Sequence, residues 1–175
     1  MKTPNSKKTI FSTLALLLVT SIAWSQASPA ATATGSINGA NVTIKYSSPS
    51  VKGRAIYGTD LVPYGGQVWR AGANSATVFE TDKDLTVEGK KLPAGKYSIY
   101  AIANEKEWVI IFNSKTGQWG INRDHTTTLD PALDVIRVNV KPRKSATMNE
   151  RLVYTIDNKG FVLAWENVEV PVSIK

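Results

Sequence analysis

Residues 108–112 read Trp-Val-Ile-Ile-Phe, a row of five large apolar side chains. Successive side chains of a β-strand point to opposite faces of the sheet, so an unbroken apolar run needs cover on both faces. The run is too short for a helix, and β-branched and aromatic residues favour strands. We therefore predict that residues 108–112 form a central strand of the hydrophobic core.

The segments around this run also have strand character. Residues 96–102 precede it across a polar loop at 104–107, which predicts a β-hairpin. After it, Ile136, Val138 and Val140 alternate with neighbours on the other face, as in a half-exposed strand. Further short β-rich runs separated by turn residues occur at 42–46, 54–57, 77–80, 85–87, 152–156, 161–165 and 168–174.

The spacing of these runs predicts the fold class. Beyond the N-terminal segment, no window of a dozen residues has the i, i+3, i+4, i+7 apolar face of a helix. We predict an all-β, single-domain antiparallel β-sandwich, jelly-roll-like, of about nine or ten strands. The alternative is a closed β-barrel. The domain is expected to cover residues 37–175, after a flexible lead-in at 26–36 that is rich in Ala, Ser, Thr and Pro.

Residues 1–25 have the three parts of a secretory signal peptide. Lys2, Lys7 and Lys8 precede an uncharged, mostly apolar run at 10–24, and small residues favour cleavage after Ser25. The run is shorter than the about 20 residues that span a bilayer. The chain has no cysteine for a lipid anchor. We expect a periplasmic or secreted protein that is not a lipoprotein and has no membrane span after cleavage.

The amino-acid composition excludes several kinds of catalytic and metal site. The 175 residues include no cysteine and one histidine. These counts exclude disulfides, cysteine nucleophiles, thiolate metal sites and zinc sites with several histidines, and we expect no metal or cofactor. The leader takes three lysines with it, so the formal net charge falls from +7 to +4. The remaining basic residues are scattered, so nucleic acid is not an expected partner.

Two long irregular segments, 61–76 and 113–131, interrupt the strand pattern. Long irregular segments in compact domains are usually functional loops or mobile ones. Both of these contain tryptophan beside polar donors, which indicates loops that are packed down. An indole can stack on a ligand and a guanidinium can bind a carboxylate or phosphate. In the structural alternative, the loop tryptophan fills the core while the arginine and asparagine hold the loop backbone. The candidate ligand-binding residues are Trp69, Arg70, Asn74, Trp119, Arg123, Asp124 and His125.

Several motifs of the chain resemble a known family. They include Ser-Pro-Ser-Val-Lys-Gly-Arg at 48–54, Val-Trp-Arg-Ala-Gly-Ala-Asn at 68–74 and Lys-Leu-Pro-Ala-Gly-Lys-Tyr-Ser at 91–98. In these motifs the chain resembles an exported bacterial family catalogued as domain of unknown function 2911. The resemblance covers residues from about 41 to 175 and implies an exported single domain. It carries no established activity, so it assigns no catalytic residue.

Three functions remain open, and the sequence favours the first over an enzyme. A non-catalytic binding or interaction module would use the two loops to hold a small polar or glycan-like ligand, or an envelope protein. A hydrolase would use Asp124, His125 and a loop Ser or Thr. However, neighbouring side chains on an extended chain point apart, and no Gly-x-Ser-x-Gly elbow marks a nucleophile. The third possibility is a structural or assembly protein of the cell envelope.

Overall fold

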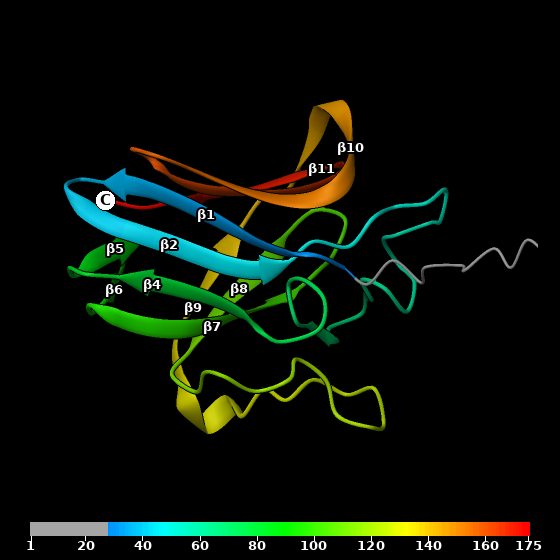
Figure 1. Cartoon of the computed structure of the whole chain (residues 1–175), viewed down its shortest axis with the longest axis horizontal. Coiled ribbons are helices and arrows are strands. Elements are labelled where there is room, and N and C mark those ends of the chain that lie inside the picture. The colour runs from blue at the N-terminus through cyan, green and yellow to red at the C-terminus, as the bar shows by residue number, and fades with distance from the viewer. Residues whose placement is uncertain (1–27) are drawn as a thin grey trace, which may run out of the picture.

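A computed structural model describes residues 28–175, which form eleven β-strands and one short 3-10 turn, η1 (Figure 1). The predicted signal peptide at 1–25 lies outside the described residues. Within them, no helix is long and apolar enough to cross a membrane. The elements are β1 (Ala30–Ile37), β2 (Ala40–Ser47), β3 (Val68–Trp69), β4 (Thr77–Thr81), β5 (Leu85–Val87), β6 (Lys90–Leu92), β7 (Gly95–Ile102), β8 (Trp108–Asn113), η1 (Pro131–Leu133), β9 (Asp134–Val140), β10 (Arg143–Asp157) and β11 (Gly160–Ser173).

The main sheet is antiparallel, with the order β1-β2-β4-β7-β8-β9, and β3 pairs with the end of β7. As predicted, β8 is a central strand, hydrogen-bonded to β7 on one side and β9 on the other. Trp108, Ile110 and Phe112 join the main core, whereas Ile111 joins a second cluster on the opposite face. Both faces of β8 are therefore covered.

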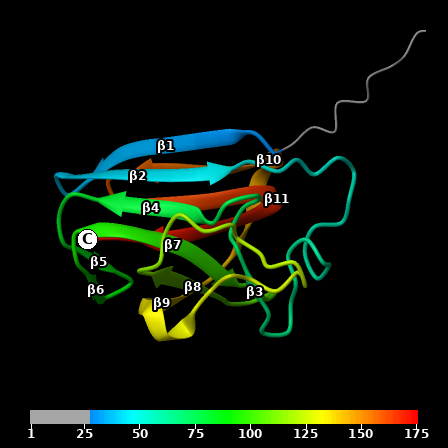
Figure 2. The same cartoon turned by 60° about the horizontal axis from the view of Figure 1, so that its bottom comes forward.

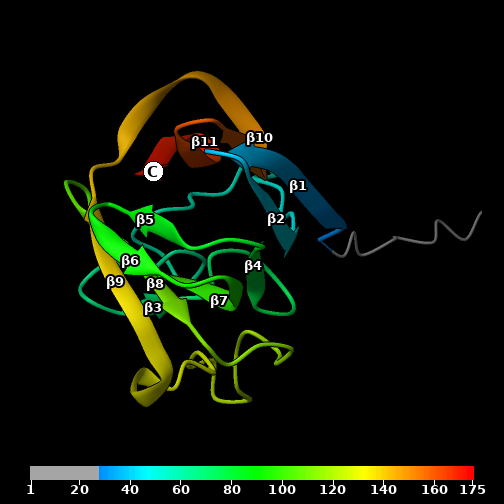
Figure 3. The same cartoon turned by 90° about the vertical axis from the view of Figure 1, so that its left-hand side faces the viewer.

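The second layer is the β10–β11 hairpin, which lies across the main sheet (Figures 1 and 2). β11 turns back on itself at Glu166, where φ is 52°, so the Ile174 amide donates a 2.8 Å hydrogen bond to the carbonyl of Lys159. This return brings β5 beside the end of β11 through a bridge between Val87 and Ile174. Figure 3 shows β10 arching over the main sheet.

These layers confirm the predicted all-β class and antiparallel β-sandwich. Neither layer closes on itself, so the alternative of a closed barrel is wrong. The core between the layers is aromatic: Phe79 contacts Phe112 edge to face with ring centroids 5.3 Å apart, and Tyr154 packs near Phe161. Large rings of this kind supply much of the apolar area that such a core buries.

Two details differ from the sequence prediction. The lead-in expected to be flexible at 26–36 contains all of β1 except Ile37, and β1 pairs with β2 over its whole length. An Asn38-Gly39 turn joins the two strands, with φ of 49° and 77°, the geometry in which this dipeptide is preferred. The predicted strand at 54–57 does not form. There, Lys52 and Gly53 have positive φ of 49° and 66°, and the Arg54 amide donates to the carbonyl of Val51 at 3.1 Å, so the backbone forms a turn instead of pairing as a strand.

Candidate functional site

The two long loops lie side by side at one end of the sandwich. Ser75 and Trp119 form an isolated antiparallel bridge. Beside it, the Ala76 amide donates to the carbonyl of Gln118 at 3.1 Å, and the Gly120 amide donates to the carbonyl of Asn74 at 3.0 Å. Residues 61–76 and 113–131 are therefore joined by backbone hydrogen bonds and form one structural unit.

A chain of hydrogen bonds holds the second loop on the sheet. Gln118 Nε2 donates to Tyr100 Oη at 2.9 Å, and Tyr100 Oη lies 3.0 Å from Thr128 Oγ1. Thr128 Oγ1 in turn donates to the carbonyl of Trp119 at 2.6 Å. Since Tyr100 is fully buried on β7, this network fixes both arms of the loop against the outer face of the sheet.

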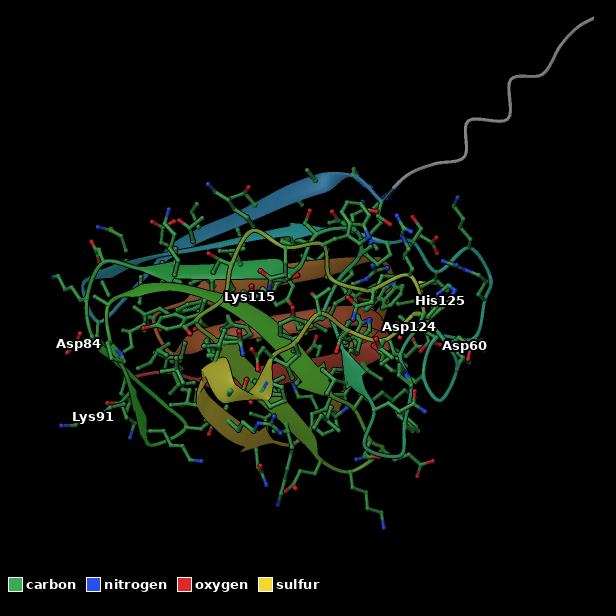
Figure 4. All side chains as sticks on the ribbon, turned by 90° about the horizontal axis from the view of Figure 1, so that it is seen from below. Asp60, Asp84, Lys91, Lys115, Asp124 and His125 are labelled. Carbon is green, nitrogen blue, oxygen red and sulfur yellow. The ribbon has the colours of Figure 1, made fainter. Side chains whose placement is uncertain are left out.

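A cleft of about 910 Å³ opens between the first loop, the tip of the second loop and β11. Its buried lining includes Trp69 and Trp165, whose rings stack on each other. Its exposed lining includes Asp60, Asp124 and His125. Figure 4 shows these three residues at the same end of the molecule, on two different loops. The cleft therefore combines an aromatic floor with a polar rim.

Arg70 contributes a half-buried guanidinium to this lining. Within residues 28–175, its hydrogen bonding is limited to one contact, from Nη1 to the carbonyl of Asn74 at 3.3 Å, and no carboxylate lies within ion-pair distance. Burial lowers the pKa of this guanidinium from its usual value because the charged form loses hydration. A guanidinium carries five N–H donors, so Arg70 retains donor capacity beside the cleft.

Trp165 contributes a second donor. Its side chain is 1% exposed and lines the cleft, yet its indole Nε1 has no acceptor within the described residues. Its backbone carbonyl, by contrast, accepts a 2.9 Å hydrogen bond from Tyr57 Oη. Burial of an N–H group without an acceptor costs about 1–3 kcal/mol, and such groups are few in native proteins.

The structure places four of the seven candidate residues in this cleft: Trp69, Arg70, Asp124 and His125. Asn74 lies behind it, in a left-handed conformation with φ of 57°, and its side-chain amide donates to the Ser28 carbonyl and Ser47 Oγ. Arg123 and Trp119 are exposed and do not line the cleft; Trp119 is 56% exposed. The sequence analysis grouped the seven candidates because they lie in the two long loops. In the structure, four of them line the cleft and the other three do not.

Asp124 is hydrogen-bonded to Thr126 and not to the neighbouring His125 within the described residues. Asp124 Oδ1 accepts hydrogen bonds from the Thr126 hydroxyl at 2.6 Å and from the Thr126 amide at 3.1 Å. These bonds hold the pKa of Asp124 below its usual value. The His125 imidazole makes no hydrogen bond to a hydroxyl or carboxylate of the described residues. Among them, no three His, Asp or Glu side chains are grouped to hold a metal ion.

Among the residues that line the cleft, Arg54, Asp60 and Trp165 were not among the candidates from the sequence. Trp165 is the last residue of the strand predicted at 161–165, and it belongs to the main core. No local signal marks it as part of the cleft, because only the return of β11 and the packing of the two layers bring it beside Trp69. Asp60 follows Gly58 and Thr59, residue types that favour turns, so the sequence could have predicted a turn there. In the structure, Thr59 Oγ1 donates to the carbonyl of Ile56 within this turn.

These features define an antiparallel β-sandwich with a loop-lined cleft at one end. The chain belongs to the family described as "Protein of unknown function (DUF2911)", whose sequence model matches residues 28–174. This match confirms the family resemblance of the sequence motifs. No curated protein matches the chain, and no solved structure matches it.

Proposed function

We propose that this protein is a non-catalytic binding module that holds a small polar ligand in the cleft between its two long loops. The observation that carries the proposal is that the guanidinium of Arg70 is half-buried and has no carboxylate partner within the described residues. Arg137 and Arg143 are paired with the carboxylates of Asp134 and Glu169. The remaining arginines of residues 28–175 other than Arg70, namely Arg54, Arg123 and Arg151, have no such partner but are exposed. Arg70 is half-buried beside a cleft without such a partner, so its donors are available to a ligand.

The size and lining of the cleft support this proposal. Small-molecule sites have volumes of about 300–1,000 Å³ and combine apolar walls with a few polar groups. The cleft, at about 910 Å³, is within that range. Trp69 and Trp165 supply aromatic surface, and Arg70 supplies a charge. Because these three are held by the core and by β3 and β11, the floor is in place before a ligand arrives.

The hydrolase alternative has no supporting geometry in the described residues, because Asp124 bonds to Thr126 instead of orienting the imidazole of His125. Ligand capture outside the cytoplasm is the version of the proposal that fits the predicted leader at residues 1–25. Cell fractionation tests this part separately. Recovery of the full-length, uncleaved chain in the cytoplasm would contradict it and leave the binding proposal intact.

A thermal-shift screen of the purified protein tests the binding proposal. The probes are libraries of amino acids, sugars, organic acids and phosphates, with hits measured again by calorimetry. The matched variants are Arg70→Met and Arg123→Met, which remove the same charge from inside the cleft and from the exposed face of the second loop. We expect a hit to bind the wild type and Arg123→Met and to lose at least about tenfold in affinity, or about 1.4 kcal/mol, with Arg70→Met. Equal binding to both variants, or no hit, contradicts the proposal.

A further inference from the structure

We propose that the ligand of the cleft is a small zwitterion of the amino-acid type. Its carboxylate is held by Arg70 and the indole N–H of Trp165, and its protonated amine faces Asp60 and Asp124. The inference rests on the proposed function and specifies the chemistry of the ligand. It follows from the positions of donors, acceptors and charges around the cleft.

The unpartnered buried side-chain group of the cleft is a donor. Two buried side-chain polar atoms in residues 28–175 lack a partner, namely Trp165 Nε1 and Gln118 Oε1. Gln118 lies on the outer face of the sheet, where its amide bonds to Tyr100, and it does not line the cleft. Trp165 does line it, and an indole nitrogen can only donate. A ligand atom that satisfies Trp165 must therefore be an acceptor.

Arg70 specifies the charge of that acceptor. A half-buried guanidinium has lost part of its hydration, and an anion restores more of that loss than a neutral oxygen does. One guanidinium in a cleft lined by two indole rings balances a single negative charge. A carboxylate carries one charge and matches the planar fork of the guanidinium, whereas a phosphate dianion would leave excess charge beside apolar rings.

The rim carries the opposite charge. Asp60 and Asp124 line the cleft and are exposed, and Asp60 accepts no hydrogen bond from the described residues. The other charged group of the rim, Arg54, already donates to the carbonyls of Val51 and Ser50. A simple anion would enter past two carboxylates. A zwitterion places its cation beside them, so both ends of the ligand meet groups of opposite charge.

The walls between floor and rim fit the body of such a ligand. Leu61, Pro63 and Ile121 line the cleft and are each partly exposed. They provide apolar surface for a side chain of moderate size. The volume leaves room for a ligand larger than the smallest amino acids. We therefore expect amino acids with apolar or aromatic side chains to bind more tightly than glycine.

Calorimetry with the wild-type protein tests the inference. The probes are the free L-amino acids, followed by the amide of the tightest one, which lacks the carboxylate, and its N-acetyl derivative, which lacks the cation. We expect the amide to bind at least about tenfold more weakly and the N-acetyl derivative about three- to tenfold more weakly. Equal affinity for the free amino acid and its amide would overturn the inference.

Variants of the protein test which residues bind the carboxylate and which bind the amine of the ligand. Arg70→Met is expected to remove the preference for the free amino acid over its amide. The double variant Asp60→Asn with Asp124→Asn is expected to remove the preference over the N-acetyl derivative. The control is Glu105→Gln, an exposed acidic residue between β7 and β8 that does not line the cleft; it should keep both preferences.

The outcomes separate this inference from the proposed function. If no free amino acid binds but a sugar, phosphate or amine-free acid binds in an Arg70-dependent way, the zwitterion is wrong and the binding module stands. If no probe binds, or if binding ignores Arg70→Met, both are wrong. Circular dichroism of each variant verifies the fold, and a variant that fails it is replaced by the conservative Arg70→Lys, which should weaken binding because lysine lacks the planar fork.

Discussion

The indole rings of Trp69 and Trp165 lie nearly parallel, at 11°, with their centroids 6.2 Å apart. Trp69 belongs to β3 of the main sheet and Trp165 to β11 of the second layer, so this stack joins the two layers. Trp69 also packs edge to face on Trp108, at 6.0 Å and 88°. The floor of the cleft is therefore continuous with the hydrophobic core.

Removal of one ring of this stack should destabilise the whole domain. Trp69→Ala is expected to lower the free energy of unfolding by about 3–5 kcal/mol, since it leaves a large cavity between Trp108 and Trp165. Urea denaturation followed by circular dichroism measures this change. The control is Trp119→Ala, which removes the same ring at an exposed position and should cost less than about 1 kcal/mol. Equal losses in the two variants would contradict the assignment of Trp69 to the core.

The junction of the two loops depends on Gly120. A Cβ at this position would lie 2.5 Å from Arg70 Cδ and 3.1 Å from the Asn74 carbonyl oxygen. Gly120→Ala is therefore expected to displace the Arg70 side chain, to lower stability by about 1–3 kcal/mol and to weaken any ligand that depends on Arg70. Thermal denaturation and ligand titration measure the two effects.

Gly117→Ala is the control for this prediction. Gly117 lies in the same loop with nothing within 4 Å of its Cβ position, and its φ of 86° is the sole source of strain. Its cost should be about 1 kcal/mol, with no change in ligand affinity. If Gly117→Ala also abolished binding, the loss would come from general loosening of the loop and not from contact with Arg70.

The hydroxyl of Tyr100 should control the mobility of the second loop. Tyr100→Phe keeps the buried ring and removes the bonds to Gln118 and Thr128. We expect a loss of about 1–2 kcal/mol in stability and faster amide hydrogen exchange across residues 113–130. In the matched variant Tyr97→Phe, the lost bond is to the Pro93 carbonyl near β6, so exchange in the loop should not change.

Acid stability should depend on Asn41. Its side-chain Nδ2 and its backbone N–H both donate to the carboxylate of Asp82, and these bonds hold the pKa of that carboxyl below its usual value. A lowered pKa in the folded state stabilises the protein at neutral pH, and the stabilisation is lost as pH falls through that pKa. Asn41→Ala should therefore lower the urea midpoint at pH 7 and have a smaller effect at pH 2. A difference that stays constant with pH would contradict this account.

Much of the fold could be predicted because local pattern and tertiary environment agree. The apolar run of β8 requires cover on both faces, and the structure provides it with the core on one face and the second loop on the other. The prediction was wrong for β1, where the local sequence pattern does not reflect the tertiary environment. β1 has small side chains and no apolar stripe, and it packs against β10 through Gly35, where a Cβ would lie 2.6 Å from Ile156. The Asn38-Gly39 turn was the one local signal for this strand.

The candidate site could be predicted only in part, because the sequence shows which loops are long but not which face each side chain occupies. Trp69 and Trp119 have a similar sequence signal, an aromatic ring beside a polar residue in a long loop. One is buried under the cleft and the other points to solvent, and the difference arises from the pairing of the two loops. Trp165 reaches the cleft because β11 packs on the main sheet. This packing is a tertiary contact that no local sequence pattern predicts.

The return of β11 has a consequence for the order in which the molecule is built. The two loops that line the cleft are synthesised before β11, and the ring that completes its floor belongs to β11, the final strand. A nascent or truncated chain that lacks β11 has no closed floor and leaves Trp69 without its stacking partner. Under the proposed function, a chain that stops before β11 should therefore fail to bind the ligand of the complete protein.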